Sequence, residues 1–182
     1  MAAKYYLTFD VMKDIYKDIV EKPVEESSVK IFWLKLLFDY FPKKENFCIV
    51  LVHTHGAQFS YHAIELLSLQ ENQPSTKATK GIFLHDEDRE EKYDWEWAVE
   101  KLTQIMVQRR TEERLDGQAM FGVVSIGRYN KFYQLNSREE KCVAYPRTEG
   151  RCYEIAADEE ELHLLLVGLA DKCRDLRVKV RE

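Results

Sequence analysis

The chain has 182 residues, which is enough for one domain with a full hydrophobic core but not for two comfortable ones. Its hydrophobic fraction of 45% and charged fraction of 32% are those of an ordinary globular protein and exclude a disordered chain. The net charge of −5 argues against a general nucleic-acid coat, because phosphate binding needs a basic face, but it leaves room for a local basic groove.

The first half of the chain predicts two helices and then two strands. Apolar residues recur at helical spacing over residues 9–21 and form a wide stripe over 29–41. The continuous apolar run at 47–52 is typical of a buried strand, and residues 59–69 are predicted as a second strand. The polar stretch 71–81 predicts a loop that is disordered or acts as a mobile lid, and residues 82–84 form at most a short strand.

The second half predicts a helix, four strands and a last helix. The helix runs from Trp95 to about Arg114, and a Gly127-Arg128 turn joins two strands over 121–135. The other three predicted elements are short strands at 142–145 and 152–156 and a helix from 159 to about 174. The final stretch, 175–182, is a charged tail.

The order of elements, ααββαββββα, predicts the fold class. Strands and helices do not alternate regularly, so we expect an α+β fold with a mixed sheet flanked by helices rather than a doubly wound fold. The whole chain, 1–182, is predicted to form this single domain.

The cysteines and the N-terminus indicate where the protein works. Cys48, Cys142, Cys152 and Cys173 show no Cys-x-x-Cys spacing, which favours reduced thiols. The first residues lack the apolar core of a secretory signal, and no apolar run approaches the about 18 residues that span a bilayer. We therefore expect an intracellular protein, cytoplasmic or nuclear, without a membrane partner.

Two histidines at the end of the first predicted strand form a candidate zinc site. His53 and His55 are two residues apart, so in a strand both imidazoles face the same side. His62 or Glu65 on the facing strand would supply a third ligand. The alternative is a polar hairpin end without metal, which is the more frequent reason for such a pair.

Basic and aromatic residues interleave in the second half and form a candidate binding surface. Arg109 and Arg110 end the third helix, and Arg128, Tyr129 and Lys131 lie in the hairpin. This combination suits a phosphate backbone or an acidic peptide. Strand alternation favours the plainer interpretation, in which these side chains only decorate the face opposite the core.

Three segments resemble the PD-(D/E)XK nuclease-like proteins. They are the helix LTQIMVQRR at 102–110, the strand FGVVSIG at 121–127 and the Lys-Phe-Tyr sequence at 131–133. The resemblance covers about residues 29–135 and implies a restriction-endonuclease-like core. In that family an acid and a Glu-x-Lys motif bind magnesium and activate water.

The nuclease motif is incomplete in this chain. Glu65 matches the glutamate of the motif, but Leu67 stands where the lysine would be, and no Asp precedes Glu65 on the hairpin. A metal site for phosphodiester cleavage needs clustered carboxylates, and the lysine stabilises the charge that develops on the phosphate. The residues therefore predict that catalysis is lost.

The sequence supports three functional hypotheses. The first is a non-catalytic domain that binds another macromolecule, with a protein as the first choice of partner and nucleic acid as the second, and with no cofactor expected. The second is a magnesium-dependent nuclease that uses Glu65. The third is a zinc-binding protein that uses His53 and His55.

Overall fold

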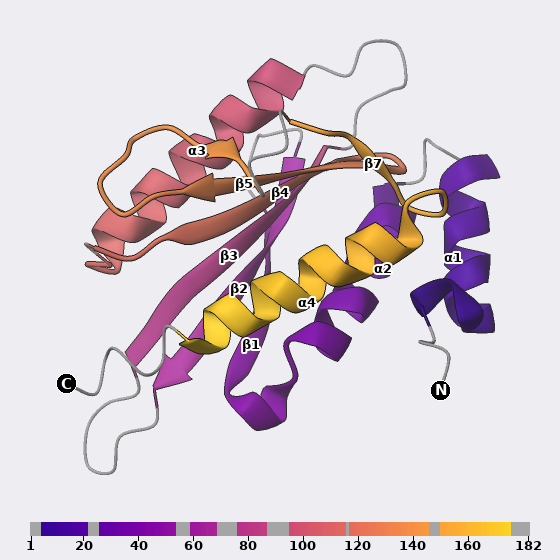
Figure 1. Ribbon diagram of the computed structural model, residues 1–182, viewed down its shortest axis with the longest axis horizontal. Coiled ribbons are helices and arrows are strands. Elements are labelled where there is room, and N and C mark those ends of the chain that lie inside the picture. Colours follow the sequence, from indigo (N-terminus) through magenta and orange to yellow (C-terminus); the bar gives the residue numbers. More distant parts are fainter. Residues whose placement is uncertain are drawn as a thin grey trace.

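A computed structural model describes most of the chain (Figure 1). The residues outside the description are 1–4, 22–25, 54–58, 69–75, 87–94, 116, 146–149 and 176–182. The helices are α1 (Asp10–Glu21), α2 (Glu26–Tyr40), α3 (Trp95–Glu112) and α4 (Glu159–Asp175), with short 3-10 turns at Tyr6–Thr8 and Lys43–Glu45. The strands are β1 (Phe47–His53), β2 (Phe59–Ser68), β3 (Thr76–Asp86), β4 (Met120–Ile126), β5 (Tyr129–Leu135), β6 (Val143–Ala144) and β7 (Tyr153–Glu154).

All seven strands form one mixed sheet in the order β1-β2-β3-β4-β5-β6, and β7 also pairs with β5. Strands β1, β2 and β3 form an antiparallel meander. Strand β4 is parallel to β3, so the chain crosses over between them through α3. Strand β5 then returns antiparallel to β4. The predicted α+β class with one mixed sheet in one domain is therefore confirmed.

The helices divide the core into two layers, one on each face of the sheet. Helices α1, α2 and α4 bury one cluster of apolar side chains, in which Phe32, Trp33 and Leu37 of α2 are almost fully buried. Figure 1 shows α4 crossing this face, with α1 at the end of the sheet near β7. Helix α3 covers the opposite face through Ala98, Leu102 and Met106.

Strand β3 is longer than the sequence predicted. The stretch 71–81 was expected to be a loop and residues 82–84 at most a short strand, but β3 runs from Thr76 to Asp86, and only 71–75 lie outside the described residues. Polar Thr79 and Lys80 are buried, and side chains of the segment after α3, Glu113 and Gln118, hydrogen-bond to them. An irregular register at Ile64 and Glu65 also breaks the simple alternation of a strand.

The β4–β5 hairpin has the predicted position and turn. Ile126 pairs with Tyr129, so the loop has two residues, and Gly127 at its first position has a φ of 54°. A second glycine in this hairpin serves packing. A Cβ atom on Gly122 would lie 2.7 Å from Leu102 Cδ2, so this glycine lets α3 approach β4 closely.

Candidate functional site

The predicted residues Glu65 and Arg109 meet in a buried polar cluster between the sheet and α3. Arg109 Nη1 lies 4.0 Å from Glu65 Oε1 and 3.3 Å from Glu113 Oε1. Arg109 Nη2 also donates a hydrogen bond of 3.4 Å to the Tyr61 hydroxyl. Burial by itself lowers the pKa of Arg109, but Tyr61 and Glu113 together raise it, so the guanidinium stays charged.

The same cluster continues onto β3. The Glu113 carboxylate accepts a hydrogen bond of 2.6 Å from the Thr79 amide and one of 2.7 Å from the Thr79 hydroxyl. The Lys80 ammonium donates to the Gln118 side-chain oxygen. Burial lowers the pKa of Lys80, and the neighbouring Cys173 and Glu113 oppose this shift. The cluster therefore pairs its charges internally and ties α3 to β3.

This arrangement is a poor metal centre. Glu65 and Glu113 both approach one guanidinium, so a positive charge already occupies the space between the two carboxylates. Among the residues that the structure describes, no three His, Cys, Asp or Glu side chains are grouped so that they could hold a metal ion. A cation at this position opposes the binding of Mg²⁺, which prefers to be held by negatively charged oxygens.

Arg110 lies apart from this cluster and stabilises the chain after β5. Its guanidinium donates hydrogen bonds to the carbonyl oxygens of Asn136 (2.9 Å) and Glu139 (2.8 Å). The residue is only 8% exposed, so it has little surface to offer a partner. Its neighbour in sequence, Arg109, is likewise engaged internally.

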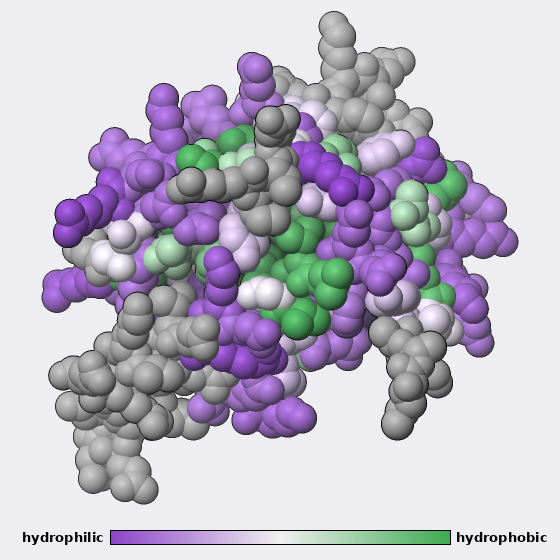
Figure 2. All heavy atoms as spheres, in the orientation of Figure 1, coloured by the Kyte–Doolittle hydropathy of each residue, from purple (hydrophilic) through white to green (hydrophobic). Residues whose placement is uncertain are grey.

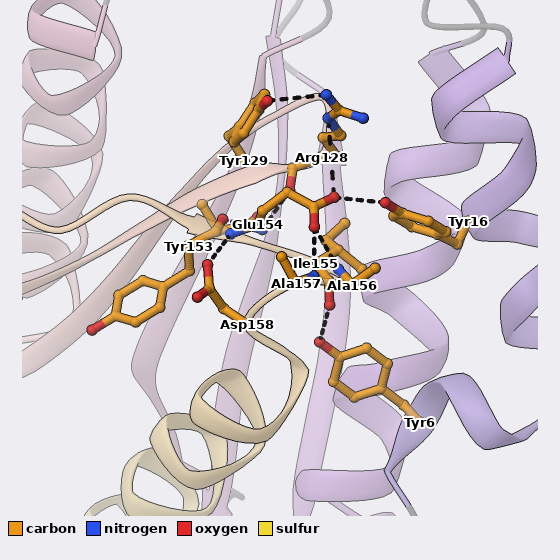
Figure 3. A network of polar contacts seen from close by, with 11 residues as sticks. Tyr6, Tyr16, Arg128, Tyr129, Tyr153, Glu154, Ile155, Ala156, Ala157 and Asp158 are labelled. Atoms are coloured by element: carbon orange, nitrogen blue, oxygen red, sulfur yellow. Dashed lines mark hydrogen bonds and ion pairs between the residues drawn. The ribbon is translucent and has the colours of Figure 1, made fainter.

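Arg128 and Tyr129 belong to a network at the tip of the β4–β5 hairpin (Figure 3). Arg128 Nη2 donates to the Tyr129 hydroxyl (3.1 Å), and Arg128 Nε lies 4.0 Å from Glu154 Oε1. Glu154 also accepts hydrogen bonds from the Tyr16 hydroxyl (2.6 Å) and the Ala157 amide (2.6 Å). The network therefore joins α1, the hairpin tip and the turn before α4.

Lys131, the last predicted binding residue, lies in a groove beside α3. The side chain is half-buried, and Nζ lies 4.5 Å from the centroid of the Trp95 ring. The groove has a volume of about 960 Å³ and runs between the outer side of α3 and strand β5 with the segment after it. Its walls are Trp95, Glu96, Val99, Glu100, Thr103, Gln104, Val107 and Gln108 on α3, and Lys131, Tyr133, Glu140, Lys141 and Cys142 opposite.

The groove has an apolar floor, one acidic rim and one rim on which lysines predominate. Val99, Val107 and Cys142 pack against the core beneath α3 and form the floor with Tyr133. The α3 rim carries Glu96 and Glu100, whereas the strand side carries two lysines, Lys131 and Lys141, and one acid, Glu140. The face that carries α4 differs from the groove. Figure 2 shows that it is mostly hydrophilic, with hydrophobic residues near its centre. The hollow beside α4 has a volume of only about 300 Å³.

Two titratable side chains of the groove, Cys142 and Tyr133, have a raised pKa. Burial raises the pKa of the Cys142 thiol, which keeps it protonated and therefore weakly nucleophilic. Burial, the largest cause, together with the neighbouring Cys142 and Cys152 also raises the pKa of Tyr133 to about 12. Both side chains therefore remain neutral hydrogen-bond donors near neutral pH.

The structure does not describe the side chains of the candidate zinc ligands His53 and His55. His55 lies outside the described residues, and the side chain of His53, at the end of β1, is not described either. The zinc site remains a prediction that elemental analysis of the purified protein, with His53→Ala/His55→Ala as control, can test.

Sequence reasoning missed Glu113 and the groove itself. Glu113 comes directly after α3, in a stretch with other charged residues, and nothing in its spacing distinguishes it from a solvated glutamate. The groove brings α3 together with β5 and the segment after it, although β4 lies between α3 and β5 in the sequence. The one sequence feature that pointed to the groove was Lys131, which lies among the aromatic residues Tyr129, Phe132 and Tyr133.

Comparisons of the chain with models of protein families, with curated proteins and with solved structures find no match. Within the described ranges, no helix is both long and apolar enough to cross a lipid bilayer.

Proposed function

We propose that this protein is a non-catalytic intracellular domain that binds another protein through the groove beside α3. The observation that supports this function is the groove: about 960 Å³, with an apolar floor and polar rims. A buried apolar centre within a polar rim is the usual anatomy of a protein interface. The four cysteines form no disulfide, which fits a reducing compartment in the cytoplasm or nucleus.

The layer architecture supports a helix as the docked element. Helices α2 and α4 together cover one face of the sheet, while α3 is the one described helix on the other. The groove lies beside α3 and over β5, where a second helix of that layer would lie. From Trp95 to Gln108 it runs along α3 for about 20 Å, which fits about 13 residues of a partner helix.

The charges on the two rims define the chemistry of that helix. The partner would place basic side chains against Glu96 and Glu100 and acidic side chains against Lys131 and Lys141, with an apolar stripe between them. Lys131 is positioned by its contact with Trp95. Nucleic acid fits this surface less well, because the only charged residues described on the α3 side of the groove are the acids Glu96 and Glu100.

The nuclease-like resemblance is part of the same proposal. Helix α2, the β1–β3 meander, α3 and the β4–β5 hairpin occur in an order compatible with such a core. Arg109 beside Glu65 supports the loss of metal-dependent cleavage, because the ion pair neutralises the carboxylate that a magnesium ion would need.

Photo-crosslinking tests the docking surface. A photoreactive amino acid at Gln104, an exposed position on the groove wall, is expected to give one discrete adduct in cells that express the protein. The adduct should disappear when Val107→Asp is added, and should persist with Val20→Asp on α1, a matched change at an exposed valine outside the groove. An adduct that resists Val107→Asp would contradict the proposal.

Incubation with nucleic acid separates binding from catalysis. The purified chain is expected to leave DNA and RNA intact in Mg²⁺ or Mn²⁺. Metal-dependent cleavage that is abolished by Glu65→Ala but retained by Glu112→Ala, at the end of α3, would replace the binding function with the nuclease function.

A further inference from the structure

The two edges of the sheet are protected to different degrees. After strand β5 come the short strands β6 and β7, which pair with different parts of it and leave little free backbone. Strand β1 is the opposite edge and pairs with β2 alone among the described strands. All seven residues of β1 pair with β2 in one regular register, so the strand is not interrupted by a bulge.

The sequence of β1 lacks the devices that keep sheet edges apart. Edge strands commonly carry a lysine, a proline or a bulge, because their unpaired N–H and C=O groups otherwise attract another strand. FCIVLVH, residues 47–53, contains no proline and no Asp, Glu, Lys or Arg. Leu51 is 40% exposed, and the side chains of residues 48–50 and 52 are half-buried.

We propose that two copies of this chain pair through β1, antiparallel, with Val50 opposite Val50 of the second copy. A two-fold axis through that point, perpendicular to the sheet, keeps every side chain on its own face and joins two sheets into one. Ile49 then lies opposite Leu51, and Cys48 opposite Val52. Every pair between residues 48 and 52 is apolar in this register, so no like charges face each other across the interface.

A second copy fits this edge for two reasons. The run 48–52 is chemically symmetric about Val50, so the strand is its own complement in this register. Helix α2, which contacts β1, also carries two large exposed apolar side chains, Ile31 (43%) and Phe38 (52%). Joining two sheets edge to edge brings these helices toward each other and offers apolar area beyond the strands alone.

Sedimentation velocity and cysteine crosslinking test the pairing. From about 1 to about 100 μM, the range of moderate protein affinities, the protein should be a dimer. Leu51→Lys should raise the dimer dissociation constant at least about tenfold, because it sets a charge against an apolar side chain at the edge. Leu164→Lys, at the 62% exposed position on α4, should leave the dimer unchanged.

The register has its own measurement, which does not depend on whether Leu51→Lys folds. In a Cys48→Ser/Cys152→Ser background, Val50→Cys should form a crosslinked dimer on mild oxidation, because directly opposed Cβ atoms lie about 4.5–5.5 Å apart and a small movement of the strands brings them to the roughly 4 Å of a disulfide. Leu51→Cys should crosslink poorly. A monomer at all concentrations, or a dimer in which Val50→Cys does not crosslink, overturns the proposal. Val107→Asp should remain dimeric, which separates this edge from the groove.

Discussion

The two faces of the sheet are closed in different ways. The α2/α4 face is filled by apolar side chains, and Trp33 at its centre contacts the rings of Phe32 and Phe83. The α3 face combines an apolar layer with the buried cluster of Glu65, Arg109 and Glu113, and it leaves a groove open beside the helix. This difference indicates that the α2/α4 face mainly stabilises the fold. The α3 face is covered less completely and leaves exposed the surface that we propose to be functional.

The largest effect is expected on the apolar face. Trp33→Ala should lower the free energy of unfolding by about 3–5 kcal/mol, because the fully buried indole leaves a cavity. Trp33→Phe should cost much less, since the indole N–H has no hydrogen-bond partner among the described residues. Urea denaturation measures both. Leu164→Ala, at an exposed position on α4 of the same face, should stay within about 0.5 kcal/mol of the unmodified protein.

The second-largest loss of unfolding free energy is expected in the polar cluster of the α3 face. Glu113→Ala removes both hydrogen bonds to Thr79 and leaves its buried amide without that acceptor, at an expected cost of about 2–4 kcal/mol. Glu112→Ala, the neighbouring exposed glutamate, should change stability by no more than about 0.5 kcal/mol. Equal effects of the two changes in chemical denaturation would show that the cluster does not hold α3 to β3.

A smaller effect is expected where α1 closes the end of the apolar face. Tyr16→Phe removes the hydrogen bond to Glu154 and should cost about 1.5–3 kcal/mol near neutral pH, because the acceptor is charged. Burial and Glu154 raise the pKa of Tyr16 to about 12, above its ordinary value of 10.0. The phenol therefore stabilises the fold fully below pH 10 and loses this contribution as the pH rises toward 12.

The difference in unfolding free energy between the protein and Tyr16→Phe should thus stay constant up to about pH 10 and narrow between about pH 10 and 12. Denaturation curves at a series of alkaline pH values measure it. A difference that grows with pH in this window would mean that the phenol does not donate to Glu154.

The groove should contribute least to stability. Val107→Asp places a carboxylate at a half-buried position that faces the groove. We expect it to lower the free energy of unfolding by about 1 kcal/mol or less. Thermal unfolding of Val107→Asp and Val20→Asp measures this cost. A loss as large as that of Trp33→Ala would mean that the groove wall is part of the core and not a free surface.

The sequence predicted most of the elements because their signals are local. The apolar stripe of 29–41, the run at 47–52 and the Gly127-Arg128 turn each specify an element through neighbouring residues, and the structure has all three. Strand β3 was predicted too short, because its first half has the composition of a loop. Thr79 and Lys80 can be buried because they hydrogen-bond to Glu113 and Gln118, which lie more than 30 residues away in the sequence.

The candidate site was predictable only in part. Lys131 was identified from its aromatic surroundings in the sequence, and it does line the groove. Arg109 was identified as a basic residue at a helix end, but its role inside the cluster depends on Glu65 and Glu113, which only the fold brings to it. Arg110 faces backbone carbonyls that no sequence pattern could assign to it.

The affinity of the crosslinked partner for variant proteins tests the central proposal most directly. Isothermal titration calorimetry with the purified partner should give a dissociation constant at least about tenfold higher for Val107→Asp than for the unmodified protein, a loss of about 1.4 kcal/mol. Val20→Asp should bind as the unmodified protein does. Equal affinity of all three proteins would show that the groove beside α3 is not where the partner docks.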